Sequence, residues 1–461
     1  MRYFTIVFFT VLLSSAVIAQ DECSAFVTDA LASVDTLCEA TGRNELCYGN
    51  NIVSVTTVTG DELNFSQPGD IVPINQIDSI RTNPYAEPDE WGIALMKLQA
   101  NIPDSLPGQN VTFLLFGDAS LTSAIPADET APSLSARTTN TINVRSGPST
   151  NNAVIDSLQA NTAIKLIGRN AAGDWVYFTA DNRSGWLFAS LLQIDGDVMT
   201  LNEVADDFAA SSTPSPMQAV YFSSGIGESS CSEVPQDGIL IQTPDYKEPI
   251  ELVINDTQIS LGSTVYLQAE ANNAMSLYVL EGQATVTADS ETQVVPQGSF
   301  TTVPIDENLH ATGSPTKAES YDMNTIESVP ISNLDEAIVI AEPASDDVLQ
   351  TAHNQSLVAG YWTNTDTDGS SQWMLIQPTH DGSFNVTYRD EGASVCGKDA
   401  SGTPIHAANG DGTGMLDGTE FTVNMNWACE GGNGRSGTIT IHYTINSNGS
   451  MTDDSGLVWT R

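Results

Sequence analysis

Short apolar runs, each ended after a few residues by Gly, Pro, Asn or Asp, recur along most of the chain. Alternating apolar and polar positions over such runs are typical of strands that bury one face, and the residues that end them favour turns. We expect strands at 52–58, 92–99, 110–116, 217–222, 238–242, 250–254, 263–267, 275–280, 284–287 and 299–303. Strands this short and this closely spaced predict sandwiches or barrels, so the expected fold class is mainly β and multidomain.

The N-terminal segment differs from this pattern. Arg2 precedes an apolar run over 4–13, and Val17-Ile18-Ala19 forms an A-x-A-like cleavage site, which together are typical of a secretory signal peptide over 1–19. Apolar residues at helical spacing then predict a helix over 24–39. No later stretch has the roughly 18 consecutive apolar residues that a membrane helix needs. We therefore expect an exported chain, secreted or held at the cell surface, without membrane insertion.

One segment predicts a small barrel of its own. The run 142–149 begins with alternating apolar and polar residues and ends in a Gly-Pro turn, and further strands follow at short intervals. Together with Trp175 and the run Gly185-Trp186-Leu187, it resembles the bacterial SH3-like (SH3b) domain. The resemblance implies a module over 136–196 that binds cell-wall peptide or a protein partner at the envelope.

Five residues of this segment are candidate ligand contacts: Asn143, Arg145, Trp175, Tyr177 and Trp186. Asn143 and Arg145 are expected on the face opposite Ile142 and Val144, because side chains alternate along a strand. The aromatic rings could either fill the core or stay partly exposed to a ligand. Arg145 could bind a carboxylate of a wall peptide or form a structural salt bridge to Asp174 or Asp181.

Two β regions flank the small barrel, over 20–118 and 217–330, and linkers rich in Ala, Ser, Thr, Pro and Asp are expected at 119–135 and 197–216. Within 236–306, the runs Leu280-Glu281-Gly282-Gln283-Ala284 and Val295-Pro296-Gln297-Gly298 resemble the periplasmic FecR-type domain, which implies a double-wound β fold. The similar strands at 110–116 and 217–222 suggest that both regions form one unit into which the barrel is inserted. Three separate domains in a row are the alternative.

The C-terminal part predicts a second barrel. A linker with partial helix is expected at 331–356, followed by an antiparallel barrel of about eight short strands over 357–461. Its start, Gly360-Tyr361-Trp362, resembles the G-x-W start of lipocalin-like barrels, which implies that the tryptophan plugs one end. Gly412-Thr413-Gly414, Cys429 and Trp459-Thr460-Arg461 also resemble C-terminal modules of exported bacterial proteins, a likeness that implies no activity.

The six cysteines all follow the expected signal peptide, and an even number in an oxidising compartment suggests disulfides. The helix over 24–39 separates Cys23 from Cys38 by about 22 Å, too far for a bridge. Cys38 could reach Cys47 through the turn at 41–42, and Cys396 and Cys429 are expected to pair within the C-terminal strands. Cys23 is then left for Cys231, although Cys38 or Cys47 could equally take Cys231.

The charge narrows the possible partners. With 58 acidic and 15 basic residues the formal charge is −43, which repels phosphate backbones and argues against nucleic acid as a partner. No cofactor is implied. The single calcium candidate is the run with Asn364, Asp366 and Asp368, whose oxygens alternate as in the first half of an EF-hand loop. Position twelve of such a loop is Leu375, so a polar hairpin turn is the competing interpretation.

Catalysis is not expected, because none of the five histidines lies in a recognisable catalytic motif and no G-x-S-x-G run is present. The sequence therefore predicts a secreted, non-enzymatic protein that binds cell-wall peptide, peptidoglycan or an envelope protein through its SH3b barrel. The alternative is a lipocalin-like protein that binds a small molecule, or an exported enzyme, with its site in the C-terminal barrel near Trp362 and Trp427.

Overall fold

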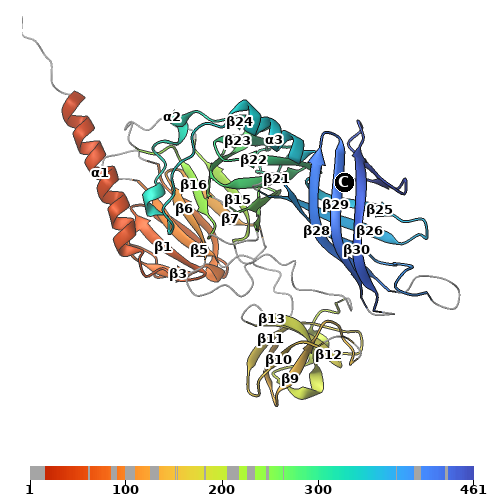
Figure 1. The fold of residues 1–461 in the computed structure, drawn as a ribbon. Helices are drawn as coiled ribbons and strands as arrows, with labels where there is room; N and C mark the ends of the chain where they lie inside the picture. Colours follow the sequence, from red (N-terminus) through yellow and green to blue (C-terminus); the bar gives the residue numbers. More distant parts are fainter. Residues whose placement is uncertain are drawn as a thin grey trace, which may run out of the picture.

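The computed structural model describes residues 16–60, 63–84, 91–98, 110–124, 134–150, 152, 154–180, 183–204, 217–225, 234–244, 249–262, 264–379, 382–398, 406–430 and 434–461. For residues 16–24, 155, 156, 179, 180, 183 and 184 it describes the backbone alone. Strands dominate these residues, so the expected fold class is confirmed. The strands form four sheets (Figure 1).

Two of the sheets face each other as a sandwich. The first, in spatial order, contains β24 (Glu319–Ser320), β23 (Ser299–Pro304), β20 (Ala274–Glu281), β19 (Thr264–Ala269), β16 (Gly238–Gln242), β6 (Val111–Phe116), β5 (Ile93–Leu98), β1 (Glu45–Asn50) and β3 (Ile71–Pro73). The second contains β2 (Val53–Thr57), β4 (Ile77–Thr82), β7 (Ala119–Ser123), β15 (Ala219–Ser224), β17 (Ile250–Ile254), β18 (Thr257–Leu261), β21 (Gln283–Ala288) and β22 (Glu291–Pro296). One hydrophobic cluster joins the two inner faces, with Phe113, Ile239 and Leu277 from the first sheet and Leu121, Phe222 and Ile259 from the second.

Strands from both flanking regions belong to the same two sheets. In the first sheet β6 pairs with β16, and in the second β7 pairs with β15 in the register Ser123 to Val220. The main-chain N–H of Ala124 donates to the carbonyl of Ala219 at 2.9 Å, which continues this ladder beyond Ser123. The small barrel therefore stands, along the chain, between two strands that are hydrogen-bonded to each other.

The first linker begins later than the sequence indicates. Residues expected at the start of a linker over 119–135 form β7 instead, and Ala119 and Leu121 are fully buried in the core of the sandwich. Two buried apolar residues in a run otherwise made of Ser and Thr give too weak an alternation to be recognised from the sequence.

A helix covers the outer face of the first sheet. This helix, α1 (Ala16–Leu37), begins earlier than expected and packs Val27, Ala30 and Val34 against the strands beside it (Figure 1). The expected disulfide from Cys38 to Cys47 ties the end of α1 to β1. Within the residues described, no helix combines the length and the apolar character needed to cross a membrane. Residues 1–15, the side chain of Cys23 and Cys231 lie outside the description, so the signal peptide and the Cys23 bridge stay predictions.

The third sheet forms the small barrel. Its spatial order is β10 (Val154–Leu158), β9 (Ile142–Arg145), β13 (Arg183–Phe188), β12 (Trp175–Ala180), β11 (Ala163–Arg169), β8 (Leu134–Thr138) and β14 (Leu192–Ile194). The chain then continues past the expected boundary at 196, because Leu201 inserts into the barrel core and Val204 packs beside Gly168. In Figure 1 this barrel stands apart from the other sheets.

The C-terminal sheet is an up-and-down barrel. Strands β25 (Gly360–Thr365), β26 (Ser371–Pro378), β27 (Phe384–Asp390), β28 (Ala408–Asp417), β29 (Glu420–Cys429), β30 (Ser436–Ile445), β31 (Met451–Asp453) and β32 (Val458–Trp459) pair in chain order. Two main-chain hydrogen bonds between Thr363 and Thr460, at 2.7 and 3.0 Å, join the first strand to the end of the last. The expected disulfide from Cys396 to Cys429 is present.

The interior of this barrel, whose eight strands all belong to the described residues, is filled by its own side chains. Trp362 is fully buried, donates from Nε1 to the carbonyl of Val358 at 2.8 Å, and lies under the guanidinium of Arg461 at 4.7 Å. The rest of the interior is occupied by large aromatic side chains, those of Phe384, Phe421, Tyr443 and Trp459. This packing argues against the lipocalin-like cup that the small-molecule alternative requires.

Two further helices lie between the sandwich and the C-terminal barrel along the chain: α2 (Met323–Ile326) and α3 (Asp346–Ser356). The second of these supplies the helix expected within 331–356 and packs on strand β22, where Ala352 and Val294 are buried together. The hydroxyl of Ser356 accepts from the main-chain N–H of Val294 at 2.8 Å. Helix α3 thereby fixes the C-terminal barrel to the edge of the sandwich.

Candidate functional site

The small barrel has a core on one face of its strands. Ile142 and Val144 of β9 point inward and pack with Leu166, Phe178 and Leu187. Because side chains alternate along a strand, Asn143 and Arg145 lie on the outer face, as the sequence predicts.

Strand register brings the other candidate residues onto the same outer face. Arg145 lies directly opposite Trp186, and Trp186 lies directly opposite Tyr177. Trp175 lies opposite Phe188, two residues along the same strands. Residues opposite each other in paired strands share one face of the sheet. Asn143, Arg145, Trp175, Tyr177 and Trp186 therefore form one surface, together with Phe188; we call these six residues the aromatic face.

Three rings of the aromatic face are buried although they lie outside the main core. Trp175, Tyr177 and Trp186 are 6%, 3% and 0% exposed and form a separate cluster with Ile167 and Val204. Tyr177 and Trp186 meet edge to face at a centroid distance of 5.5 Å. Of the two uses left open by the sequence, burial is the one found. These rings support the surface and do not themselves present a face to a ligand.

Phe188 is the exposed aromatic residue that sequence reasoning missed. Phe188 is 38% exposed, and the centroid of its ring lies 5.3 Å from that of Trp175. The signal was its position two residues after Trp186 in the same strand, which places both on one face. An exposed ring resting on buried rings is a typical anchor for a peptide or protein partner.

Arg145 makes a different contact from the salt bridges considered above. Its Nη1 donates to the main-chain carbonyl of Asn152 at 2.7 Å, across the turn that follows β9. The carboxylate of Asp174 instead accepts from Nδ2 of Asn170 at 2.8 Å, and Asp181 lies outside the described residues. The half-buried guanidinium thus braces the loop beside the aromatic face while part of it stays accessible.

A hollow of about 440 Å³ lies elsewhere on the same barrel, over the paired strands β8 and β11. Two basic residues, Arg137 and Lys165, line it together with Asp195. Sequence reasoning did not single out Arg137 and Lys165. They lie on neighbouring strands, and basic residues are few in a chain with 15 basic and 58 acidic residues.

A family model for the bacterial SH3 domain matches residues 140–193. Neither the comparison with curated proteins nor that with solved structures gives a match. The match coincides with the small barrel and confirms the SH3b resemblance for this segment; the FecR-like and lipocalin-like resemblances have no such support. The match covers the aromatic face completely.

The charge of the SH3 domain differs from that of the whole chain. Residues 140–193 contain four basic residues, Arg145, Lys165, Arg169 and Arg183, and three acidic ones, Asp156, Asp174 and Asp181. The whole chain contains 15 basic and 58 acidic residues. The net charge of the whole chain therefore repels an anionic partner, whereas the net charge of this domain does not.

The calcium candidate lies in the hairpin between β25 and β26, and its carboxylates bond within that hairpin. Asp366 accepts from Nε2 of Gln372 at 3.2 Å, and Asp368 accepts from the hydroxyl of Ser370 at 2.8 Å. The side-chain amide of Asn364 is buried without a hydrogen-bond partner among the described residues. The described part of the chain holds no group of three or more His, Cys, Asp or Glu arranged for a metal ion.

Proposed function

We propose that this chain is an exported, non-enzymatic binding protein whose SH3 domain attaches it to cell-wall peptide or to a protein partner at the envelope. Bacterial SH3 domains commonly bind peptidoglycan or proteins, and the match over 140–193 supports the same use here. The apolar leader, its A-x-A-like end and the disulfides at Cys38–Cys47 and Cys396–Cys429 support export.

The contrast in charge carries the proposal. Cell-wall peptides bear carboxylates, and a surface charge of −43 spread over the chain would repel them. Within the SH3 domain basic residues outnumber acidic ones, and Arg145, opposite Trp186, shares the aromatic face with the exposed ring of Phe188. A guanidinium and an exposed ring on one face suit a peptide that offers both a carboxylate and an apolar group.

Co-sedimentation of the purified full chain with isolated cell-wall sacculi tests this proposal. At a physiological salt concentration of about 0.15 M we expect the chain to pellet with the sacculi, and Phe188→Ala and Arg145→Gln each to weaken binding about tenfold. Leu191→Ala is the matched control, because Leu191 is 40% exposed on the same barrel but lies outside the aromatic face.

Circular dichroism melting shows whether each variant keeps its fold. A full chain that stays in the supernatant, or folded Phe188→Ala and Arg145→Gln variants that bind as well as the unchanged chain, would contradict the proposed use of this face.

A further inference from the structure

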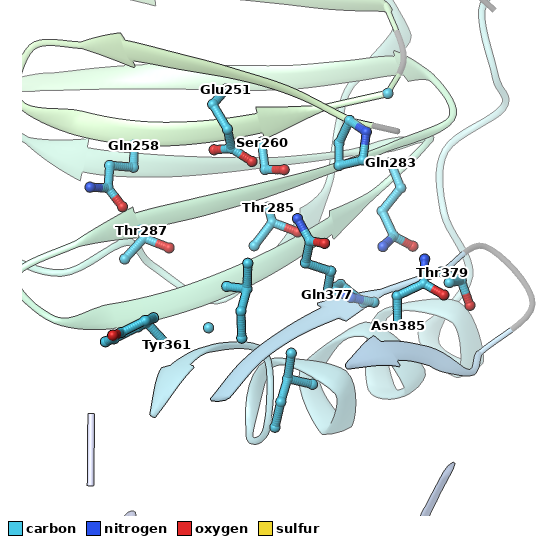
Figure 2. Close-up of a pocket in the computed structure, with 16 residues that line it drawn as sticks. Glu251, Gln258, Ser260, Gln283, Thr285, Thr287, Tyr361, Gln377, Thr379 and Asn385 are labelled. Carbon is cyan, nitrogen blue, oxygen red and sulfur yellow. The ribbon is translucent and has the colours of Figure 1, made fainter. Parts of the chain in front are cut away.

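A cavity of about 400 Å³ lies between the sandwich and the C-terminal barrel, far along the chain from the SH3 domain. Strands β17, β18 and β21 of the second sheet form one wall, and β25, β26 and β27 of the barrel form the other (Figure 2). A volume of this size lies within the range of roughly 300–1,000 Å³ typical of small-molecule sites.

The lining of this cavity is rich in neutral hydrogen-bonding groups. Four side-chain amides reach it, Gln258 and Gln283 from the sandwich and Gln377 and Asn385 from the barrel (Figure 2). The cavity is also lined by four residues with hydroxyl groups, Ser260, Thr285, Thr287 and Thr379. Each amide offers both donors and an acceptor, and each hydroxyl offers both roles in one atom. Such a lining is complementary to a ligand whose groups both donate and accept hydrogen bonds. Sugar hydroxyls are groups of this kind.

The four amides are available for a ligand. Within the described part of the chain, none of the side chains of Gln258, Gln283, Gln377 and Asn385 forms a hydrogen bond. Gln283, Gln377 and Asn385 lie close together, with Gln283 on one wall and the other two on the opposite wall, so a ligand there can bond more than one of them at once (Figure 2).

The charge of the lining does not favour anionic ligands. Glu251 is the one charged residue among the sixteen that line the cavity, and no Lys, Arg or His is among them. Burial raises the pKa of Glu251, while a hydrogen bond from Ser260 acts in the opposite direction. A phosphate or uronic acid would meet this carboxyl without a compensating cation, whereas a sugar hydroxyl can donate to it.

One side of the cavity offers an apolar platform. Tyr361 is 52% exposed, and its ring is stacked on that of Trp373 at a centroid distance of 5.7 Å. Leu375 and Pro378 extend this apolar surface along β26. The C–H face of a pyranose ring can pack against such a ring while its equatorial hydroxyls reach the amides.

Contacts outside the cavity hold its two walls in place. Besides the bond from Val294 to Ser356, Arg461 donates from Nη2 to the carbonyl of Ser356 at 2.8 Å. Nη1 of the same side chain lies 3.5 Å from the carboxylate of Glu291 in β22. A site whose walls are fixed before binding loses less conformational freedom when the ligand enters.

We infer that this cavity binds a neutral mono- or disaccharide, with the amides of Gln283 and Gln377 bonding its hydroxyls from opposite walls and Tyr361 packing against a ring face. The site lies outside the SH3 domain, so the inference goes beyond the proposed attachment to the envelope and stands or falls separately from it.

Isothermal titration of the full chain with maltose, cellobiose and N,N′-diacetylchitobiose tests this inference. We expect at least one of these neutral disaccharides to bind, and Gln283→Ala and Gln377→Ala each to weaken that binding at least fivefold. Gln350→Ala is the matched control, because Gln350 lies on the exposed side of α3 and bonds Asn354. Thr285→Val, which keeps the size of the side chain, provides a second test that leaves the wall intact.

Three results would overturn the inference. One is the absence of heat of binding for all three disaccharides at about 10 mM, a concentration that detects even millimolar affinity. The second is binding that the folded Gln283→Ala, Gln377→Ala and Thr285→Val variants all retain unchanged. The third is equal or tighter binding of an acidic sugar such as glucuronic acid. Loss of sacculus binding in the Phe188→Ala variant, with saccharide binding retained, separates this site from the SH3 domain.

Discussion

The side chain of Trp186 lies on the outer face of the small barrel and is nevertheless fully buried. Alternation along β13 is enough to predict which face it occupies, because that depends only on neighbours in sequence. Its burial depends in part on Val204, which reaches the cluster from beyond the end of the SH3 match. A contact of this range leaves no periodic signal, so the sequence predicted the face of Asn143 and Arg145 but left the burial of the rings open.

The stability of the sandwich is expected to depend on pH through Asp237, which directly precedes strand β16. Burial raises the pKa of its carboxyl to about 6, and the neighbouring carboxylate of Asp118 adds to the effect, while a hydrogen bond from the main chain of Asp118 opposes it. The folded state therefore favours the protonated acid. The stability that this preference contributes is complete below the ordinary pKa of 3.8 and is lost as the pH rises through about 6.

Urea unfolding between pH 4 and pH 7.5 measures this effect. We expect Asp237→Asn to be more stable than the unchanged chain at pH 7.5 by about 1–2 kcal/mol and to show a smaller loss of stability between the two values. Asp289→Asn, in the exposed turn between β21 and β22, is the control for removal of one negative charge. Parallel pH profiles for Asp237→Asn and the unchanged chain would show that the carboxyl of Asp237 titrates normally.

Strand β28 forms where the local composition favours a turn. Its run from Asn409 to Gly414 contains three glycines and an aspartate, which by composition favour a turn. In the barrel these glycines face bulky partners in β29, since a side chain at Gly414 would meet the ring of Phe421 and one at Gly410 would meet Met425. The glycines make room for residues that fill the interior, and this reason becomes visible only when the paired strand is known.

Strands rich in apolar residues were predictable. The expected runs 250–254 and 238–242 coincide with β17 and β16, because their apolar residues are numerous and their ends are marked by turn residues. Strand β7, with two apolar residues in a Ser- and Thr-rich run, was assigned to a linker. The difference lies in the number of apolar residues that each run contributes to the core.

Gly412 in β28 has no room for a side chain. A Cβ atom there would lie 2.2 Å from the carbonyl oxygen of Asn424 and 2.5 Å from the Cα of Met425, both main-chain atoms that cannot rotate away. We expect Gly412→Ala to lower the free energy of unfolding of the C-terminal barrel by about 1–3 kcal/mol. The fluorescence of the barrel's tryptophans measures this unfolding. Gly262→Ala, where a Cβ meets open space, is the control. A stability equal to that of the control variant would show that β28 and β29 can separate without cost.

At the scale of the whole molecule, sequence similarity between the runs 110–116 and 217–222 pointed to strands on either side of an inserted barrel. The structure pairs β6 with β16 and β7 with β15. The sequence could suggest this because both runs have the same strong strand character. It could not indicate that α3 and Arg461 join the C-terminal barrel to β22, or that a polar cavity forms at that junction, because those contacts connect separate parts of the chain.

This arrangement places the proposed binding module in a segment that can be removed. Ser123 and Val220 are directly opposite each other in β7 and β15, so a few Gly and Ser residues can replace 125–216 and close the two strands as a hairpin. The sandwich and the C-terminal barrel keep every strand pair that the structure describes for them.

Co-sedimentation of this shortened chain with cell-wall sacculi, beside the full chain, tests whether the SH3 domain attaches the protein to the envelope. We predict that the shortened chain keeps a cooperative melting transition and its two described disulfides, and that it stays in the supernatant while the full chain pellets. A shortened chain that is folded and pellets as completely as the full chain would contradict the claim that the SH3 domain attaches this protein to the envelope.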